Sequence, residues 1–485
     1  MKPNIIFFMT DQQRWDALGC VNSLVKTPNL DRLARNGILF RQAVCQTPQC
    51  VPSRYSMMLG KYSSQIGVLT NGDTIIDDAD LPGVPLPELF RLAGYQTAGF
   101  GKTHWNNGLS ARYPSRRGFD VRAIGQPRDS ELYEEGALMM GEVAPDHLAA
   151  YFQETDAFGP GEEEAPGYIG CTSSIPPGWH RDGWVAEQCL DFIENGIDPE
   201  RPLFLYLSFL KPHAGFNVPE KFEQLYRLED IPDVETPPWD EESGTHLSCG
   251  NTPWLDARYQ RWRASWGLMD LQERRRATLR YWANCSWLDD YFGQVFRALE
   301  KQGVLENALI VFTSDHGDMM GERNHRFSKY CLYDGSVRVP LIISGNAVVP
   351  ELHGMVSDRP AELIDLVPTL CDTAGIPTDL PGENLFEAPV REGTFCEYHG
   401  GGMDEENPAP SYMWRTSKWK LILFRDGTQT NPGPLRGELY DLQDDPLEWN
   451  NLYDIPRYCS VQAELTSCLQ QHINELSLAF GARDF

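Results

Sequence analysis

Short apolar runs alternate along the chain with segments in which apolar residues recur at helical spacing. The clearest strand candidates cover residues 4–9, 203–209, 308–313 and 339–344, and weaker ones cover residues 38–43 and 97–100. This alternation is typical of β-α-β units, in which helices connect parallel strands. The pattern therefore predicts an α/β fold built on a mainly parallel sheet flanked by helices.

Helical periodicity marks the connecting segments 29–36, 86–93, 184–194 and 271–301. The first two are each followed directly by a glycine, which is a common helix stop. The longest carries aromatic residues at near-helical spacing, and this is the pattern of a helix face packed in a core. We therefore expect its aromatic stripe to be structural.

The last quarter of the chain has a different character. An aromatic and basic stretch, residues 411–424, leads through turn-forming residues into segment 438–442, and helical periodicity returns over residues 461–479. We expect a small antiparallel sheet closed by a helix. The predicted units are an N-terminal domain that holds the chemistry described below, residues 1–375, and a C-terminal α+β subdomain, residues 376–485.

Composition narrows the class of protein. The 485 residues are 41% hydrophobic and 11% aromatic, which is enough apolar material for a large core and excludes a disordered chain. There are 42 Lys and Arg against 69 Asp and Glu, a net charge of −27. This acidic excess argues against nucleic acid and against an anionic membrane surface as partners.

Targeting signals are also missing from the sequence pattern. The apolar run at residues 5–9 is shorter than a signal-peptide core, and no apolar stretch approaches the roughly 18 residues of a membrane span. The twelve cysteines form no CxxC pair, which is typical of a reducing compartment. We therefore expect a cytoplasmic protein without a membrane association.

Polar residues are concentrated directly after four of the apolar runs. The four segments are residues 10–13, 101–104, 211–213 and 314–318, with the sequences Thr10-Asp11-Gln12-Gln13, Gly101-Lys102-Thr103-His104, Lys211-Pro212-His213 and Ser314-Asp315-His316-Gly317-Asp318. In open parallel sheets, ligands bind outside the carboxyl ends of the strands. We therefore expect the four segments to converge on one crevice.

The side chains of these segments fit two kinds of ligand. A hard divalent cation such as Ca²⁺, Mg²⁺ or Mn²⁺ would suit the mostly oxygen-donor set Asp11, Gln12, Asp315 and His316. A multiply oxygenated anion would suit the basic set Lys102, His104, Lys211 and His213. Each residue alone has a plainer explanation, since an aspartate after a strand can cap a helix and a single histidine is often structural.

Cys50 stands at the start of another predicted helix. Pro52 and Ser53 suit a first helical turn, and Gly60 suits the end of the helix. Backbone N–H groups and the helix dipole favour anions at such a position, so the thiol could be a nucleophile with a lowered pKa. A buried cysteine that merely precedes a helix is the alternative.

Together these residues resemble the formylglycine-dependent sulfatases of the alkaline-phosphatase-like superfamily, in the bacterial branch of arylsulfatases and phosphonate monoester hydrolases. The similarity covers residues 3 to about 452. The matching motifs are C-x-P-S-R at Cys50-Val51-Pro52-Ser53-Arg54, G-K-x-H at Gly101-Lys102-Thr103-His104, and S-D-[HN]-G-[DE] at Ser314-Asp315-His316-Gly317-Asp318. The resemblance implies the alkaline-phosphatase-like fold, with a large mixed, mainly parallel sheet, and a catalytic sulfatase domain over residues 1–375.

The resemblance also implies a mechanism. A maturation enzyme would oxidise Cys50 to formylglycine (3-oxoalanine), whose hydrated aldehyde attacks the sulfur of a small-molecule sulfate ester. Aryl sulfates are the expected substrates. The alcohol leaves, and a covalent sulfate ester of the enzyme remains. Loss of a proton from the second hydroxyl then expels sulfate and restores the aldehyde.

Residue roles follow from the same resemblance. The metal would be held by Asp11, Gln12, Asp315 and His316 together with the formylglycine oxygen of residue 50. The implied catalytic and substrate-binding roles are Arg54 against the nucleophile, Lys102 and Lys329 on the sulfate oxygens, His104 as base for the elimination, and His213 with Lys329 at the leaving oxygen. Asn71 would line the pocket or form a turn.

Two positions depart from most sulfatases. Gln12 and His316 stand where Asp and Asn are usual, and both changes resemble the bacterial branch that contains phosphonate monoester hydrolases and related arylsulfatases. Ca²⁺ is the expected metal, with Mn²⁺ or Mg²⁺ as alternatives, and the histidine nitrogen suits Mn²⁺. Because Lys102 and His104 keep the sulfatase pattern, we favour a sulfatase, with phosphonate monoester or phosphodiester hydrolysis as the alternative.

We expect the polar stretches 159–177 and 231–252 to determine substrate specificity, since they are predicted insertion loops. Aromatic residues in or near them could stack on an aryl or sugar group or simply anchor the loops; they are Trp179, Trp184, Trp239 and Trp254. Tails like residues 376–485 often help pair subunits in the bacterial branch, so the resemblance is also compatible with a homo-oligomer.

Overall fold

The computed structural model describes most of the chain. The described residues are 2–75, 77–104, 117–127, 138–140, 170–235, 237, 269–325, 328–387, 390–400, 409–425, 427–431 and 433–476. The predicted loops 159–177 and 231–252 therefore lie largely outside the described residues, as do Trp239 and Trp254.

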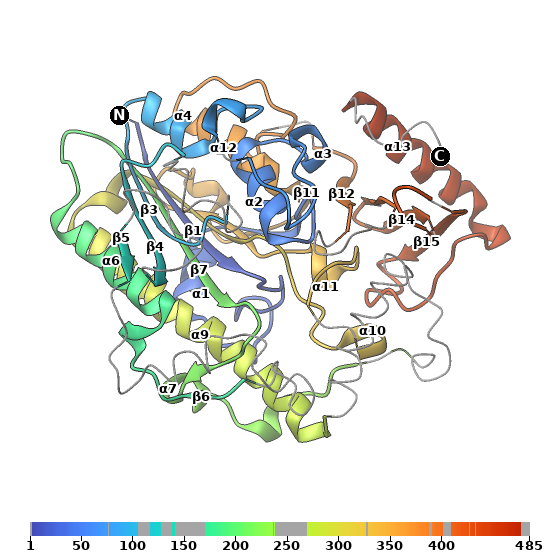
Figure 1. Ribbon diagram of the computed structural model, residues 1–485, viewed down its shortest axis with the longest axis horizontal. Helices are drawn as coiled ribbons and strands as arrows, with labels where there is room; N and C mark the ends of the chain where they lie inside the picture. The colour runs from blue at the N-terminus through green and yellow to red at the C-terminus, as the bar shows by residue number, and fades with distance from the viewer. Residues whose placement is uncertain are drawn as a thin grey trace.

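Within these ranges, a nine-stranded sheet runs through the centre of the molecule (Figure 1). In order across the sheet, its strands are β11 (Met355–Glu362), β2 (Gly37–Val44), β10 (Leu341–Ser344), β9 (Ala308–Ser314), β1 (Asn4–Asp11), β7 (Leu203–Pro212), β3 (Gln96–Gly101), β4 (Val121–Pro127) and β5 (Leu138–Met140). Neighbouring strands are parallel, except that β10 is antiparallel to both β2 and β9. The predicted mixed, mainly parallel sheet is confirmed.

The six predicted strands are present, with ends that differ by a few residues. Sequence pattern missed β4, β5 and β11. Strand β11 lies at the edge of the sheet, and its first residues are exposed, so it carries polar residues where a buried strand would be apolar. Its sequence contains no apolar run by which a strand could be predicted.

Helices cover both faces of the main sheet. One face packs against α1 (Pro28–Arg35), α6 (Arg181–Asn195) and α9 (Leu271–Lys301), and the other against α2 (Cys50–Leu59), α4 (Leu86–Leu92) and α12 (Leu366–Thr373). Successive β1 residues alternate between the two clusters, with Ile6 and Phe8 on the first face and Ile5 and Phe7 on the second. A sheet buried on both faces explains its nearly continuous apolar strands.

The long helix α9 confirms the structural interpretation of its aromatic stripe. The ring centroids of Phe292 and Phe296 lie 4.9 and 5.0 Å from that of Phe8 in β1. The helix begins with a capping box in which Asp270 accepts from the backbone of Glu273. Among the helices of the described ranges, none is long and apolar enough to cross a membrane.

Short elements complete the described chain. The remaining helical turns and the small strand pair are α3 (Ser63–Ile66), α7 (Glu220–Glu223), α10 (Glu322–His325), α11 (Asp334–Val337), β6 (Thr172–Ser173) and β8 (Val218–Pro219). The 3₁₀ turns are η1 (Asp78–Asp80), η3 (Pro177–Trp179), η4 (Leu228–Asp230), η5 (Val304–Asn307), η6 (Pro350–Leu352), η7 (Leu363–Asp365) and η8 (Pro456–Tyr458).

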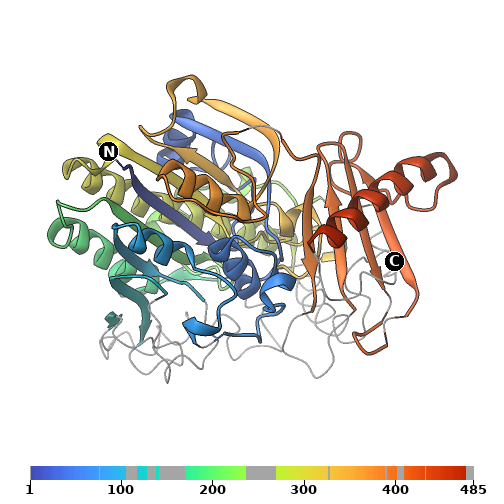
Figure 2. The ribbon, with the colours of Figure 1, turned by 90° about the horizontal axis from the view of Figure 1, so that it is seen from above.

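A smaller antiparallel sheet lies at one end of the molecule, with α13 (Cys459–Glu475) packed on it (Figure 2). As described, its four strands in order are β12 (Thr394–Tyr398), β13 (Ser411–Arg415), β14 (Trp419–Arg425) and β15 (Leu435–Asp441). The predicted antiparallel sheet and its closing helix are confirmed, although residues 477–479 of the predicted helix lie outside the described residues. The boundary at residue 376 stays a prediction; it falls between α12 and β12.

A buried ion cluster joins this smaller sheet to α11. The Asp334 carboxylate is bound by Lys420 at 2.6 Å, Arg415 at 2.9 Å and Arg338 at 3.1 Å. Burial raises the pKa of Asp334, but the three cations lower it by more, so its net pKa lies well below the usual range. Lys420 also donates to the backbone oxygen of Leu332 at 3.1 Å.

Replacing the central carboxylate tests this cluster. We expect Asp334→Asn to lower the free energy of unfolding by about 3–5 kcal/mol, because it removes the carboxylate that pairs with the buried Arg415 and Arg338. Lys420 keeps its ion pair with Glu448. The matched control is Asp358→Asn, whose exposed pair with Arg41 should contribute less than about 1 kcal/mol. Urea denaturation measures both, and equal losses in the two variants would contradict the account.

Candidate active site

The four polar segments converge at the carboxyl ends of neighbouring strands. Strand β1 ends at Asp11, and the strands on its two sides, β9 and β7, lead directly into Asp315 and His213. Strand β3, next to β7, leads into Lys102. The convergence expected from strand placement is therefore confirmed.

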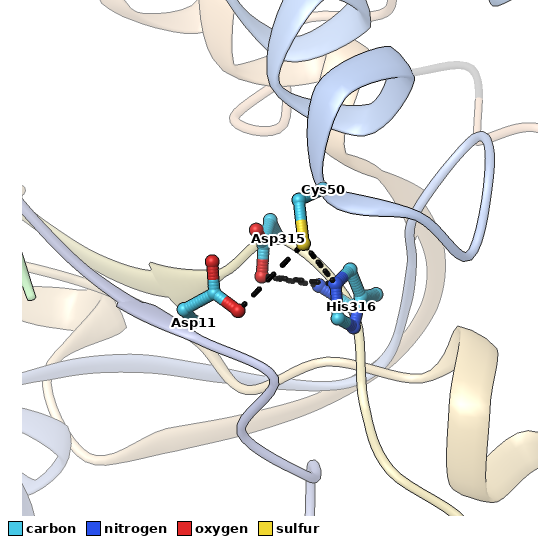
Figure 3. Close-up of side chains that lie close together, drawn as sticks. All are labelled: Asp11, Cys50, Asp315 and His316. Atoms are coloured by element: carbon cyan, nitrogen blue, oxygen red, sulfur yellow. Dashed lines mark hydrogen bonds and ion pairs between the residues drawn. The ribbon is translucent and has the colours of Figure 1, made fainter. Parts of the chain in front are cut away.

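Four side chains meet beside these strand ends (Figure 3). One donor atom each from Asp11, Cys50, Asp315 and His316 lies within 4.8 Å of the others, and all four residues are buried. Cys50 Sγ lies 3.2 Å from His316 Nε2 and 3.8 Å from Asp11 Oδ1. The residues come from β1, from the segment after β9 and from the first residue of α2.

Local sequence explains the position of Cys50. Helix α2 begins at Cys50 with Gln49 as its N-cap, and it ends at Gly60, whose φ of 64° is in the left-handed region that favours glycine. Asn71 Oδ1 accepts from the backbone N–H of Val51 at 3.1 Å, so Asn71 caps the helix that carries Cys50. A direct contact of Asn71 with substrate stays a prediction.

Arg54 holds the two carboxylates in place. Its side chain has no exposed surface, and it donates to Asp315 Oδ2 at 2.7 Å and to Asp11 Oδ2 at 3.0 Å. A third nitrogen donates to the backbone oxygen of Lys102 at 2.6 Å and to Ser208 Oγ at 3.0 Å. Arg54 thus fixes the direction in which both carboxylates present their remaining oxygens.

Two lysines border the central group. Lys102 Nζ lies 2.5 Å from Asp11 Oδ2, and Lys329 Nζ lies 2.9 Å from Cys50 Sγ. Lys329 also donates to Gln12 Oε1 at 2.9 Å, while the amide nitrogen of Gln12 donates to Asp318. Gln12 therefore adjoins the site in a fixed orientation, and its role as a metal ligand stays a prediction.

These cations change the ionisation of the site. Burial raises the pKa of Cys50, but Lys102, Lys329 and His316 lower it by more, so the thiol has a pKa well below its usual value. Burial and Cys50 raise the pKa of Asp11, and the nearby cations again outweigh them. The site therefore stabilises negative charge at the position of the Cys50 sulfur.

Both predicted catalytic histidines adjoin Cys50. Burial is the main cause that lowers the pKa of both imidazoles, with Lys102 acting on His104 and Lys329 acting on His213. Cys50 acts on both imidazoles in the direction that raises their pKa. Nδ1 of His104 is buried and has no hydrogen-bond partner among the described residues. Neutral imidazoles beside Cys50 can accept or share protons there.

The converging donors fit a divalent cation. His316 Nδ1 lies 2.9 Å from the backbone oxygen of Gly317, and because a carbonyl only accepts, the hydrogen is on Nδ1. Nε2 faces Cys50 and would bind a metal ion once it gives up its own proton. Two carboxylates already oriented by Arg54 complete a set that accepts Ca²⁺, Mg²⁺ or Mn²⁺. Asp11, Asp315 and His316 are thus the residues that would hold such an ion beside residue 50.

One expectation about the anion site was wrong. Lys211 does not join Lys102 at Cys50; its Nζ donates to the backbone oxygen of Gly215 and to Asn217 Oδ1, the latter at 2.6 Å. Lys329, from a loop more than a hundred residues later, lies at Cys50 instead. The sequence pattern also missed Ser208, which holds Arg54 from within β7, since a serine inside an apolar strand carries no signal of its own.

Two known protein families match this chain. The sulfatase family matches residues 3–376, and the family described as N-sulphoglucosamine sulphohydrolase, C-terminal, matches residues 321–475. Together the two matches span the main sheet, the site at Cys50 and the smaller sheet.

Individual relatives cover nearly the whole chain. An arylsulfatase of Clostridium perfringens is 29% identical, over 94% of this chain and 92% of its own, and a choline-sulfatase of Rhizobium meliloti is 30% identical, over 96% and 85%. The crystal structure of a phosphonate monoester hydrolase of Agrobacterium radiobacter has the same fold, with a TM-score of 0.75 and 24% identity over 98% of this chain and 96% of that one. The chain belongs to the sulfatase family and is a sulfuric ester hydrolase with the alkaline-phosphatase-like fold.

Proposed function

We propose that this protein hydrolyses sulfate monoesters, aryl sulfates first among them, with a nucleophile made from Cys50 by oxidation to formylglycine. The observation that carries the proposal is the position of Cys50. It is the first residue of α2 and its Sγ lies 2.9 Å from Lys329 Nζ. The side chains of Asp11, Asp315 and His316, which could bind a metal ion, converge on it. The arylsulfatase relative, which matches almost the full chain, supports the choice of substrate class.

Two groups would complete the site. A formylglycine at position 50, made by a maturation enzyme, would supply a hydrated aldehyde that attacks sulfur and later releases sulfate by elimination, and a divalent cation would supply a Lewis acid beside it. Asp11, Asp315 and His316 would hold the cation, with Gln12 as a further predicted ligand. Ca²⁺ is the expected metal, with Mn²⁺ or Mg²⁺ as alternatives.

Lys102 and Lys329 bind the sulfate group in this proposal. Both ammonium groups border the position of the Cys50 sulfur, and both contribute to its lowered pKa. Burial alone would lower the pKa of Lys329, but Cys50 and its other neighbours raise it, so this lysine stays charged. Fixed cations in a buried site stabilise the negative charge that develops on sulfate oxygens without reorganising at the moment of reaction.

The two histidines divide the proton transfers. His104 is neutral, and its buried Nδ1 has no hydrogen-bond partner in the part of the chain that the structure describes, so it is suited to take a proton from the nucleophile in the elimination step. His213 follows the end of β7 and borders a pocket beside the site, so it is suited to share a hydrogen bond with the leaving oxygen. Proton transfers of this kind contribute about 10²–10⁴ in rate.

A phosphonate monoester or phosphodiester hydrolase is the second candidate. The observation that favours it is the presence of Gln12 and His316 at the site. His316 Nε2 lies 3.2 Å from Cys50 Sγ, and Gln12 accepts a hydrogen bond from Lys329. We favour sulfate because Lys102 and His104 also lie at Cys50, as the sulfatase pattern requires. The same formylglycine and metal site would serve either reaction.

A kinetic comparison tests the proposed function. With mature protein, we expect kcat/KM for 4-nitrophenyl sulfate to exceed that for phenylphosphonate monoesters and bis(4-nitrophenyl) phosphate by about 100-fold or more, which corresponds to roughly 2.7 kcal/mol in transition-state binding. Cys50→Ala should lose turnover of all three esters with its fold intact, as judged by circular dichroism.

The matched control is Cys20→Ala, which removes an exposed cysteine and should keep full activity. Sulfatase activity retained by Cys50→Ala would refute the nucleophile. A preference of the wild type for phosphorus esters by orders of magnitude would replace the sulfatase proposal with the second candidate.

Metal binding has a readout that does not depend on activity. After chelation, we expect Ca²⁺ or Mn²⁺ to raise the melting temperature by about 2 °C or more, because a ligand that binds only the native state stabilises it. The metal-induced rise should vanish in Asp315→Asn and in His316→Ala, each measured against its own metal-free form. The control Asp290→Asn, at an exposed carboxylate, should keep the rise. A melting temperature indifferent to every cation would contradict the metal site.

A further inference from the structure

A pocket of about 170 Å³ opens beside His213. Its walls come from the start of α6, from the end of β7 with the loop that follows, and from Trp287 of α9. Pro212, directly before His213, pairs with Asp11 of β1, so the pocket adjoins the site at Cys50 through His213, on the side that the proposed function assigns to the leaving oxygen. It is the space into which the alcohol part of a substrate would extend.

Several polar residues of the pocket already have partners. The carboxylate oxygens of Asp182 accept from the backbone N–H groups of Leu210 at 2.7 Å and Lys211 at 2.9 Å. The Lys211 ammonium donates to Asn217 Oδ1 at 2.6 Å. These contacts hold the end of β7 against α6, so they serve the fold first.

His180 is similarly engaged and uncharged. Its Nε2 lies 2.8 Å from Ser173 Oγ, and burial together with the Lys211 charge lowers its pKa to about 3. Its ring stands edge-to-face on Trp287, with centroids 4.9 Å apart. The two rings form a rigid, uncharged wall of the pocket.

Arg181 differs from these residues because its guanidinium has no ion-pair partner among the described residues. Its Nε is buried without a hydrogen-bond partner in that part of the chain. It is also the first residue of α6, where the helix dipole disfavours a cation by about 0.3–1 kcal/mol. Helix stability therefore does not explain an arginine at this position, and its guanidinium lines a pocket with unused donors.

The N-terminus of α6 adds partial positive charge beside the Arg181 guanidinium. His180, the N-cap residue, makes no side-chain capping bond to the helix, so the first N–H groups keep their partial charge. Arg181 and Lys211 together outnumber the single carboxylate of Asp182 in the pocket lining. An anion is the ligand that this arrangement would stabilise, and a guanidinium can bind a carboxylate or sulfate through two hydrogen bonds.

We propose that the pocket binds an anionic group on the alcohol part of the substrate, with Arg181 as the residue that determines this specificity. The favoured substrates are sulfate esters of ring alcohols that carry a second anionic group, either a carboxylate or another sulfate. The inference rests on the proposed sulfatase function for the reacting half of the substrate. A cationic alcohol such as choline is disfavoured by the same charge.

Matched esters test the proposal in the mature enzyme. The probes are 3-carboxyphenyl sulfate and benzene-1,3-diyl bis(sulfate), compared with the neutral 3-carbamoylphenyl sulfate and with choline sulfate. We expect the wild type to favour the two anionic esters in kcat/KM, and Arg181→Gln to lower their advantage over the carbamoyl ester at least tenfold. Arg181→Lys should keep part of that advantage, because the charge remains. The matched control is Arg227→Gln, on an exposed arginine paired with Glu229, which should leave the ratio unchanged.

A binding arm separates this inference from the proposed function. By calorimetry, 3-hydroxybenzoate should bind wild-type protein more tightly than 3-hydroxybenzamide, and Arg181→Gln should remove the difference. If the wild type hydrolyses none of the esters, the sulfatase proposal fails, while the binding difference still decides the pocket. If Arg181→Gln changes anionic and neutral probes equally, or changes neither, the anion pocket is refuted. An advantage confined to the carboxylate or to the second sulfate identifies which anion the pocket takes.

Discussion

The active site depends on one buried interaction, the contact of Arg54 with both Asp11 and Asp315. Neighbouring strands β1 and β9 bring these two carboxylates to one point, where they would repel each other and lack water. Arg54 binds one oxygen of each and has no exposed surface. Removing a partner from such a buried group is costly, about 3–5 kcal/mol. Cys50 and Arg54 are four residues apart on α2, so they lie on the same face of the helix, and this spacing gives the C-x-P-S-R motif its physical meaning.

Local charge resolves the contrast between an acidic protein and an anionic substrate. The net charge of −27 is spread over the whole chain, and surface charges are screened beyond roughly 8 Å at physiological salt. At the site, Lys102 and Lys329 act at close range and hold the pKa of Cys50 well below its usual value. Arg181 extends the positive region to the pocket beside His213. The net charge of the whole chain therefore does not conflict with a positive region around Cys50.

Much of this arrangement was predictable from sequence because it depends on the backbone. Parallel strands place their carboxyl ends at one edge, so Asp11, Lys102, His213 and Asp315 could be expected to converge before any contact was known. Side-chain direction was less predictable: Lys211 turns to Asn217, a partner that only the loop after β7 supplies. Lys329 reaches Cys50 from a loop without periodicity, and only the family resemblance pointed to it. The edge strand β11 was missed because an exposed strand needs no apolar run.

The conversion of Cys50 to formylglycine is the central claim, because the proposed nucleophile and its release of sulfate both depend on it. Mass spectrometry of the peptide that contains residue 50, from protein made in its native host, tests the claim most directly. The account predicts an aldehyde or its hydrate at position 50 and an unmodified thiol at Cys20 in the same sample. A thiol alone at position 50, in protein that hydrolyses sulfate esters, would contradict it.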